Sequence, residues 1–130
     1  MIIGIGTDII DIRRIKNTIH RYGEKFKKRC FSNNEIIRSE NCFNTTNSYA
    51  KRYAAKEACS KALGTGLAKG IYWKDIEVLN NEFGQPLIKL HNNAVKMISK
   101  LTKKDYKIEV SLSDELNYAI ANVIIFINEK

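Results

Sequence analysis

The stretch GIGTDIIDI, residues 4–12, places two glycines and an aspartate inside an otherwise apolar run. In an extended strand, successive side chains alternate between two faces, so Ile2, Gly4, Gly6, Asp8 and Ile10 share one face. Because glycine has no side chain, that face is partly bare, and another backbone or a ligand can approach it closely. The pattern therefore predicts a strand over residues 2–10 that carries Asp8 on its partly bare face.

The segments after this strand predict an α+β fold, in which mostly antiparallel strands pack with helices. Asp11 can cap a helix that runs to about Tyr22, with Gly23 as its stop, and SNNE at residues 32–35 has the spacing of a capping box. The remaining expected elements are a long helix over residues 46–63 ended by Gly64, hairpins over 75–90 and 106–127, and a helix over 92–101. Since no linker or repeat interrupts the chain, we expect a single domain over residues 1–130.

Composition excludes several classes of protein. No apolar run reaches the ~20 residues of a membrane span, and the first residues lack the basic and apolar regions of a signal peptide. The cysteines are Cys30, Cys42 and Cys59, an odd number without metal-binding spacing. They are typical of free thiols in a reducing compartment, so we expect a cytoplasmic protein.

The net charge of +8 is concentrated near the start of the chain. Residues 12–29 hold eight lysines and arginines against Glu24 alone. Arg14 and Arg21 lie seven residues apart and so share the outward face of the expected helix. Such a face suits an anionic partner, which could be a nucleic acid, a membrane surface or an acidic protein; alternatively, it only aids solubility.

Carboxylates and a lysine supply the chemistry that the sequence allows. No dinucleotide-binding fingerprint, phosphate-binding loop or zinc-ligand spacing is present. Asp8 and Glu57 can each offer hard oxygen ligands to Mg²⁺, and Lys61, one turn after Glu57, can neutralise phosphate. A purely structural interpretation stays open, in which Glu57 and Lys61 form a surface ion pair worth about 0.3–0.5 kcal/mol and Asp8 braces a turn.

Four segments in order resemble the holo-acyl-carrier-protein synthases, the small bacterial 4′-phosphopantetheinyl transferases. They are GIGTDIIDI at residues 4–12, KRYAAKEACSKALGTG at 51–66, GQP at 84–86 and VSLSDELNYAIA at 110–121. Each segment alone is moderately specific, whereas all four in this order are highly specific. The resemblance covers almost the whole chain and implies the 4′-phosphopantetheinyl transferase fold.

The resemblance also implies a reaction and its site. Members of the family move the phosphopantetheine arm of coenzyme A onto a serine of apo-acyl carrier protein, for fatty acid biosynthesis, and release adenosine 3′,5′-bisphosphate. Asp8 and Glu57 would bind Mg²⁺, and Lys61 would contact the coenzyme A phosphates. The resemblance further implies a homotrimer with active sites between subunits, in which the residues near the nucleotide would be Gly64, Thr65, Gln85, Pro86 and Ser111.

The expected partner is then the acidic acyl carrier protein, paired with Arg14 and Arg21, rather than a nucleic acid or a membrane. One position departs from the family, because many members carry a histidine where this chain has Glu109. A carboxylate there would repel nucleotide phosphates. The missing histidine leaves open a carrier-binding protein without activity. The basic segment over residues 12–29 leaves open a small nucleic-acid-binding module.

Overall fold

The computed structural model describes residues 1–128, which fold into helices and antiparallel strands joined by turns and loops. In chain order the elements are β1 (Ile2–Asp11), α1 (Ile12–Tyr22), α2 (Glu24–Cys30), α3 (Asn33–Glu40), α4 (Thr45–Ala62), the 3₁₀ turn η1 (Trp73–Asp75), β2 (Ile76–Asn80), β3 (Pro86–Leu90), α5 (Asn92–Leu101), β4 (Tyr106–Asp114) and β5 (Tyr118–Ile127). The predicted α+β class is confirmed, as are both hairpins and the helix caps at Asp11 and Ser32.

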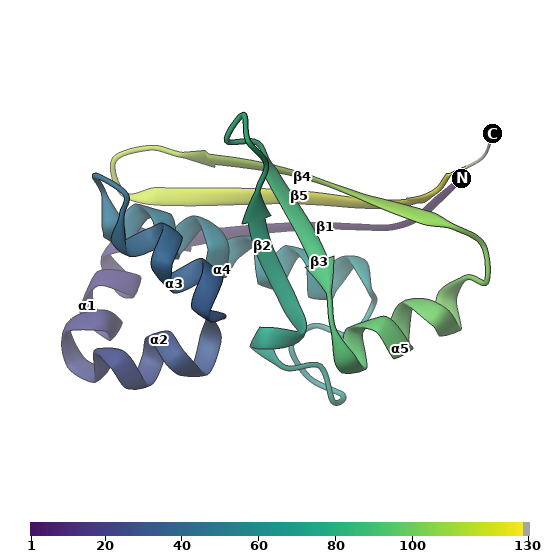
Figure 1. The fold of residues 1–130 in the computed structure, drawn as a ribbon, viewed down its shortest axis with the longest axis horizontal. Helices are drawn as coiled ribbons and strands as arrows, with labels where there is room; N and C mark the ends of the chain where they lie inside the picture. The colour runs from purple at the N-terminus through teal and green to yellow at the C-terminus, as the bar shows by residue number, and fades with distance from the viewer. Residues whose placement is uncertain (129–130) are drawn as a thin grey trace.

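The strands form two sheets. β1, β5 and β4 pair in that order, so β5 lies in the centre and β1 and β4 are the opposite edges; β2 and β3 form a separate hairpin. Figure 1 shows this hairpin running at a steep angle to the three long strands. Across the larger sheet, Thr7, Asn122 and Ser111 are paired in one row on the exposed face.

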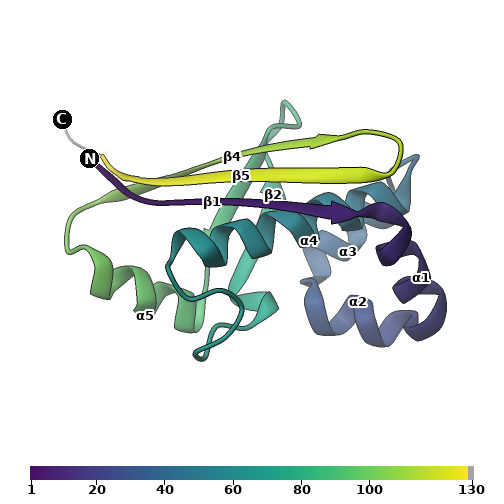
Figure 2. The same cartoon turned by 180° about the vertical axis from the view of Figure 1, so that it is seen from behind.

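The two glycines of β1 allow the long helix α4 to pack directly against the strand. A Cβ atom at Gly4 would overlap the carbonyl oxygen of Ala62, and one at Gly6 would overlap that of Ala58. The backbone that approaches the bare face of the strand is therefore that of α4, which runs alongside β1 in Figure 2. The same face carries Asp8, so close packing brings this carboxylate to the helix.

Local details differ from the sequence prediction at two places. The pairing of β1 with β5 shifts register between Ile2 and Gly4, and Ile3 rather than Ile2 packs against the core. Ile2 is 63% exposed, so its predicted place on the inward face is wrong. Helix α2 was also not predicted, because a run of lysines around Phe26 gives no clear apolar stripe.

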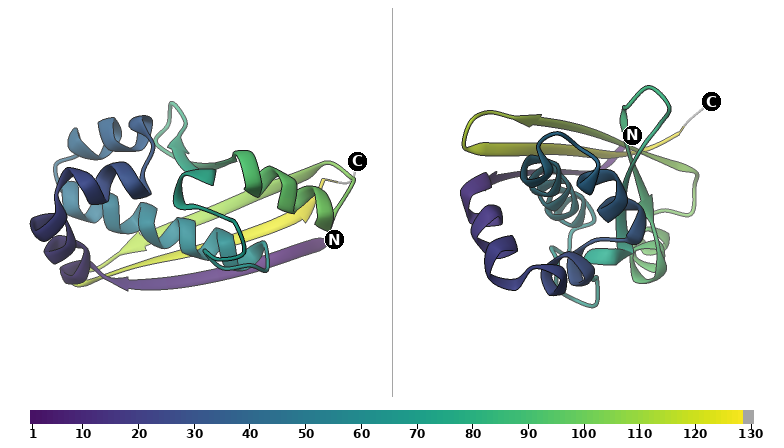
Figure 3. Two further views of the ribbon diagram at one scale, coloured as in Figure 1. Left: turned by 90° about the horizontal axis from the view of Figure 1, so that it is seen from below. Right: turned by 60° about the vertical axis from the view of Figure 1, so that its left-hand side comes forward.

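A buried ion pair fastens the helices to the β2–β3 hairpin. The Nζ atom of Lys56 lies 2.7 Å from Glu35 Oε1 and donates to the carbonyls of Trp73 and Ile76 at 2.9 and 2.6 Å. Glu35 in turn accepts from the backbone N–H of Val78. Both ions are fully buried and fully hydrogen-bonded, which joins α3, α4, η1 and β2. Figure 3 shows α4 between the large sheet and these other elements.

The prediction of free cysteines agrees with the structure. All three cysteines are free thiols; Cys30 and Cys59 are buried and Cys42 is partly exposed. Within residues 1–128, none of the helices combines the length and the apolar character that crossing a bilayer requires.

Candidate active site

Asp8 and Glu57 meet at the β1 edge of the large sheet. Asp8 projects from β1 toward α4, which carries Glu57, and the side chain of Asp8 is only 11% exposed. Burial raises the pKa of Glu57, and the adjacent carboxylate of Asp8 raises it further, both by charge and by a hydrogen bond that a shared proton would make. Two acids that are distant in sequence thus form one pair.

The positively charged ammonium of Lys61 lies next to this acid pair. Its Nζ atom lies 3.0 Å from Asp8 Oδ1 and 3.0 Å from the carbonyl oxygen of Thr7. The spacing predicted an ion pair between Lys61 and Glu57, but Lys61 forms its ion pair with Asp8 instead. Lys61 extends from the last turn of α4, and its side chain is 51% exposed, so its ammonium can move.

The residues at this edge fit a magnesium ion. Asp8 and Glu57 offer carboxylates, and Thr7 offers a carbonyl that already binds a cationic group. Among residues 1–128, no three acidic, histidine or cysteine side chains converge as a complete metal site. Mg²⁺ typically takes one or two protein carboxylates and completes its shell with waters and substrate phosphates, so a two-acid site suits it.

Gly64 and Thr65 follow Lys61 where α4 ends. The backbone N–H groups of Thr65 and Gly66 both donate to the carbonyl of Ser60, and the Thr65 hydroxyl donates to the carbonyl of Gly66 at 2.7 Å. Gly64 has φ of 85°, a conformation that favours glycine. The structure therefore places these two predicted residues beside Lys61, with their amide and hydroxyl donors already engaged locally.

The other predicted nucleotide residues lie at the opposite edge of the sheet. Pro86 and Ser111 line a cavity of about 330 Å³ between α4, the β2–β3 hairpin and β4. Gln85 lies in the adjoining turn, where its side chain accepts from Asn81. Because β1 and β4 are separated by β5, one chain presents the acid pair and this cavity on different sides.

Arg52 is a component of this cavity that the sequence analysis missed. It is 5% exposed and donates to Ser48 Oγ at 2.8 Å and to Asn80 Oδ1 at 2.6 Å, while its Nε atom has no partner. Within residues 1–128, no carboxylate lies within ion-pair distance of it, and burial lowers the pKa of its guanidinium. The signal in the sequence was its position on the buried stripe of α4, between Tyr49 and Lys56.

Arg14 and Arg21 line a basic surface formed by α1 and α2. Both border one cavity of about 380 Å³, which confirms that they share a face. Arg14 also borders a groove of about 560 Å³, whose further lining residues are Thr18, Tyr22, Lys25, Phe26, Arg29, Cys30, Tyr53 and Trp73. The surface thus combines arginines and lysines with aromatic side chains.

The aromatic part of this groove includes Tyr53, which lies one helical turn before Glu57 on α4. The rings of Tyr53 and Trp73 stack at 4.3 Å between centroids. Burial raises the pKa of Tyr53, and the nearby carboxylate of Glu57 raises it further. Phe31 and Tyr49 are buried in the core, whereas Tyr22 is 52% exposed. Tyr53 is the residue of this groove that lies nearest to the acid pair in the sequence.

Comparisons with known proteins agree with this geometry. Residues 4–121 match the 4′-phosphopantetheinyl transferase superfamily. The chain is 50% identical over 127 residues to a holo-[acyl-carrier-protein] synthase from Rhizobium meliloti, covering 96% of this chain and 91% of the relative. The crystal structure of the synthase from Neisseria meningitidis has a TM-score of 0.84 at 30% identity, with 97% and 99% of the two chains covered. The synthase from Helicobacter pylori, in complex with coenzyme A, has a TM-score of 0.81 at 32% identity, with coverage of 94% and 99%.

The fold and these matches define the class, and the chain belongs to the 4′-phosphopantetheinyl transferase superfamily. Within this superfamily it resembles the holo-[acyl-carrier-protein] synthases, with identical residues at up to half of the aligned positions over nearly the full length. The family and the enzyme class predicted from the sequence are both confirmed.

Proposed function

We propose that the protein transfers the 4′-phosphopantetheine group of coenzyme A to a serine of apo-acyl carrier protein, in a reaction that depends on Mg²⁺. The observation that carries the proposal is the acid pair Asp8–Glu57 at the β1 edge, with the ammonium of Lys61 bound to Asp8. The names of the similar synthases and the coenzyme A complex of one of them support it.

Each residue of the pair has a role in this reaction. The serine oxygen bonds to the phosphorus that carries pantetheine, the bond from that phosphorus to the bridging oxygen breaks, and adenosine 3′,5′-bisphosphate leaves. Glu57, the carboxylate of the pair that α4 carries, takes the serine proton. Lys61 steadies the charge that develops on the leaving phosphate. Asp8 and Glu57 would hold Mg²⁺, which supplies Lewis-acid polarisation of the diphosphate.

The experiment that tests the function combines purified protein, coenzyme A, Mg²⁺ and an apo-acyl carrier protein, followed by mass spectrometry of the carrier. We expect the carrier to gain the mass of one phosphopantetheine arm, and we expect chelation of the metal to abolish this gain. An unmodified carrier would contradict the function and favour an inactive carrier-binding protein. Binding of the protein to nucleic acid that depends on salt but not on metal would favour the nucleic-acid hypothesis instead.

We further propose a homotrimer in which the β4 edge of one copy completes the site at the β1 edge of the next. The exposed face of the large sheet carries Ile5 and Ile9, which are 66% and 62% exposed, beside the row of Thr7, Asn122 and Ser111. An apolar face of this kind suits burial between copies. A molar mass of one chain in light scattering at assay concentrations would contradict the trimer.

The Arg52 cavity is the proposed site for phosphate groups of the nucleotide. An arginine that is buried without a carboxylate has unused capacity to bind an anion, and Lys51 lines the same cavity. Arg52 would offset the carboxylate at Glu109, which is exposed on β4 two positions before Ser111, whereas the Nζ atom of Lys51 already lies 3.6 Å from Asp114 Oδ1. The histidine that this chain lacks is then not required for charge balance.

Replacing Arg52 by methionine is expected to weaken coenzyme A binding about 10- to 100-fold, since a charge-assisted hydrogen bond contributes about 1.5–3 kcal/mol. The same change should leave the melting temperature unchanged or higher, because it removes a buried charge that has no carboxylate partner. Calorimetry of coenzyme A binding and thermal melting measure the two effects. Arg52→Lys, which keeps the charge, should bind with intermediate affinity; unchanged affinity in Arg52→Met would contradict the assignment.

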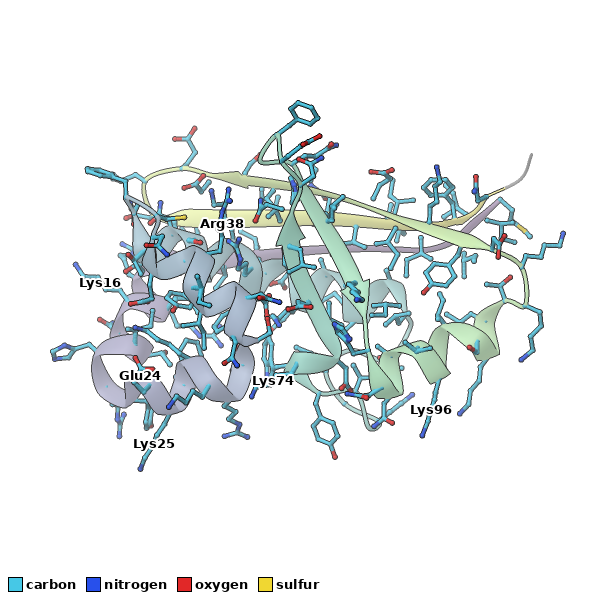
Figure 4. The ribbon with its side chains drawn as sticks, viewed as in Figure 1. Lys16, Glu24, Lys25, Arg38, Lys74 and Lys96 are labelled. Atoms are coloured by element: carbon cyan, nitrogen blue, oxygen red, sulfur yellow. The ribbon has the colours of Figure 1, made fainter. Side chains whose placement is uncertain are left out.

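The basic surface of α1 and α2 is the proposed docking site of the acidic carrier. Arg14→Glu is expected to raise the apparent KM for the carrier at least about tenfold and that for coenzyme A far less, because opposite charges across an interface steer association. Lys16→Glu is the matched control, since Lys16 borders neither cavity and points away from the protein in Figure 4. Steady-state kinetics at two salt concentrations measure this; equal changes in both KM values would argue against docking here.

The proposal places the reaction in fatty acid biosynthesis and in the cytoplasm. The free thiols of Cys30, Cys42 and Cys59 fit a reducing compartment. Deleting the gene and finding acyl carrier proteins still fully modified in the cell would contradict a role in that pathway.

A further inference from the structure

The position of Lys61 has a consequence for the order in which ligands bind. Its ammonium occupies Asp8 Oδ1 and the Thr7 carbonyl, each at 3.0 Å, which are two of the oxygens offered to a metal. Mg²⁺ binds such oxygens at about 2.0–2.1 Å. An ammonium and a divalent ion that share Asp8 Oδ1 would be neighbouring cations, with only one carboxylate charge between them to offset their repulsion.

The side chain of Lys61 is exposed enough for its ammonium to reach another anion near the acid pair. The side chain is 51% exposed, and no contact other than those to Asp8 and Thr7 holds its ammonium among the described residues. A diphosphate next to the acid pair would offer this ammonium several anionic oxygens in place of one carboxylate oxygen. Binding of the substrate would therefore draw Lys61 away from Asp8.

We propose that Lys61 is an intrinsic counter-cation of Asp8. Its ammonium prevents Mg²⁺ from binding Asp8 until a diphosphate substrate binds and the ammonium moves to the phosphate oxygens. Metal and coenzyme A then bind cooperatively, since each is favoured by the state in which Lys61 has left Asp8. By thermodynamic reciprocity, the factor by which coenzyme A raises metal affinity equals the factor by which metal raises coenzyme A affinity. Lys61 is a positioning residue for the metal in this role, which rests on the proposed function.

Binding of Mn²⁺, followed by electron paramagnetic resonance, tests this without turnover. Titrations with and without saturating coenzyme A, corrected for Mn²⁺ bound by free coenzyme A, give the coupling factor for each protein. Wild-type protein should bind Mn²⁺ weakly alone and at least about tenfold more tightly with coenzyme A. Lys61→Met should bind Mn²⁺ alone about tenfold more tightly than wild type, and with coenzyme A about as tightly as wild type, so its coupling factor shrinks.

Lys96→Met is the matched control, because it removes the same charge from the outer surface of α5, where Figure 4 shows Lys96 pointing away from the protein. This control should behave as wild type. Three results would overturn the inference: unchanged Mn²⁺ affinity in Lys61→Met, an equal gain with and without coenzyme A, or the same gain in Lys96→Met. An equal gain would show that Lys61 stays on Asp8 in the complex.

The proposed function is judged separately by the carrier mass assay on wild-type protein. If wild-type protein modifies the carrier but Lys61→Met shows no change in coupling, only the counter-cation role fails. If wild-type protein binds Mn²⁺ in neither titration, both the metal site and the role of Lys61 fail.

Discussion

Glu57→Gln is expected to lower the rate of phosphopantetheine transfer by about 10³-fold, with the fold intact. The amide can neither accept the serine proton nor supply a charged metal ligand, and general-base catalysis alone contributes about 10²–10⁴-fold. Initial rates of carrier modification, measured by mass spectrometry, give the loss. Glu115→Gln, at an exposed position in the β4–β5 turn, should retain full activity. Near-normal turnover in Glu57→Gln would refute the assigned role.

The same substitution should not destabilise the protein at neutral pH. Burial and Asp8 raise the pKa of Glu57, so its ionisation costs stability as pH rises through and above its ordinary range. Glutamine has no such cost. The melting temperature of Glu57→Gln should therefore equal or exceed that of wild type at neutral pH, and the difference should vanish in acid, where Glu57 is protonated in both the folded and the unfolded protein.

Lys56→Met is expected to reduce the free energy of unfolding by about 3–5 kcal/mol, because it leaves Glu35 charged and buried without its partner. The carbonyls of Trp73 and Ile76 also lose their donor. Urea denaturation followed by circular dichroism measures this loss. Lys96→Met, on the exposed side of α5, should change stability by less than about 0.5 kcal/mol.

The double variant Glu35→Gln/Lys56→Met distinguishes a coupled pair from two independent losses. We expect it to lose clearly less stability than the sum of the single variants, since neither change then leaves an unpaired buried charge. Additive losses, or a loss below about 1 kcal/mol in Lys56→Met alone, would show that the pair does not hold the helices to the hairpin.

Local patterns in the sequence predicted most of the fold. The caps at Asp11 and Ser32 and the alternation around Gly4, Gly6 and Asp8 depend on neighbours in the chain, and such features can be read without the structure. The shifted register at Ile2 could not be predicted, because a bulge arises from pairing with β5, more than a hundred residues away. Helix α2 was missed because packing, rather than its own periodicity, stabilises it.

The acid pair and the buried cations differ in how far the sequence revealed them. Asp8 and Glu57 could be predicted as a candidate pair because each lies in a distinctive setting, a bare strand face and an alanine-rich helix. Arg52 and Lys56 were missed, since their partners Asn80 and Glu35 lie in other elements. A charged residue on a buried stripe is visible in the sequence. Whether it pairs with an acid or has no acidic partner, and so can bind an anion, depends on the tertiary structure.

The contact between β1 and α4 has one further implication. Gly4 and Gly6 meet main-chain carbonyls rather than side chains, so no rotamer change can absorb an added methyl group there. An alanine at either place would have to move the whole helix, and Glu57 would travel with it relative to Asp8. The separation of the two acids is therefore fixed by residues that themselves carry no functional group.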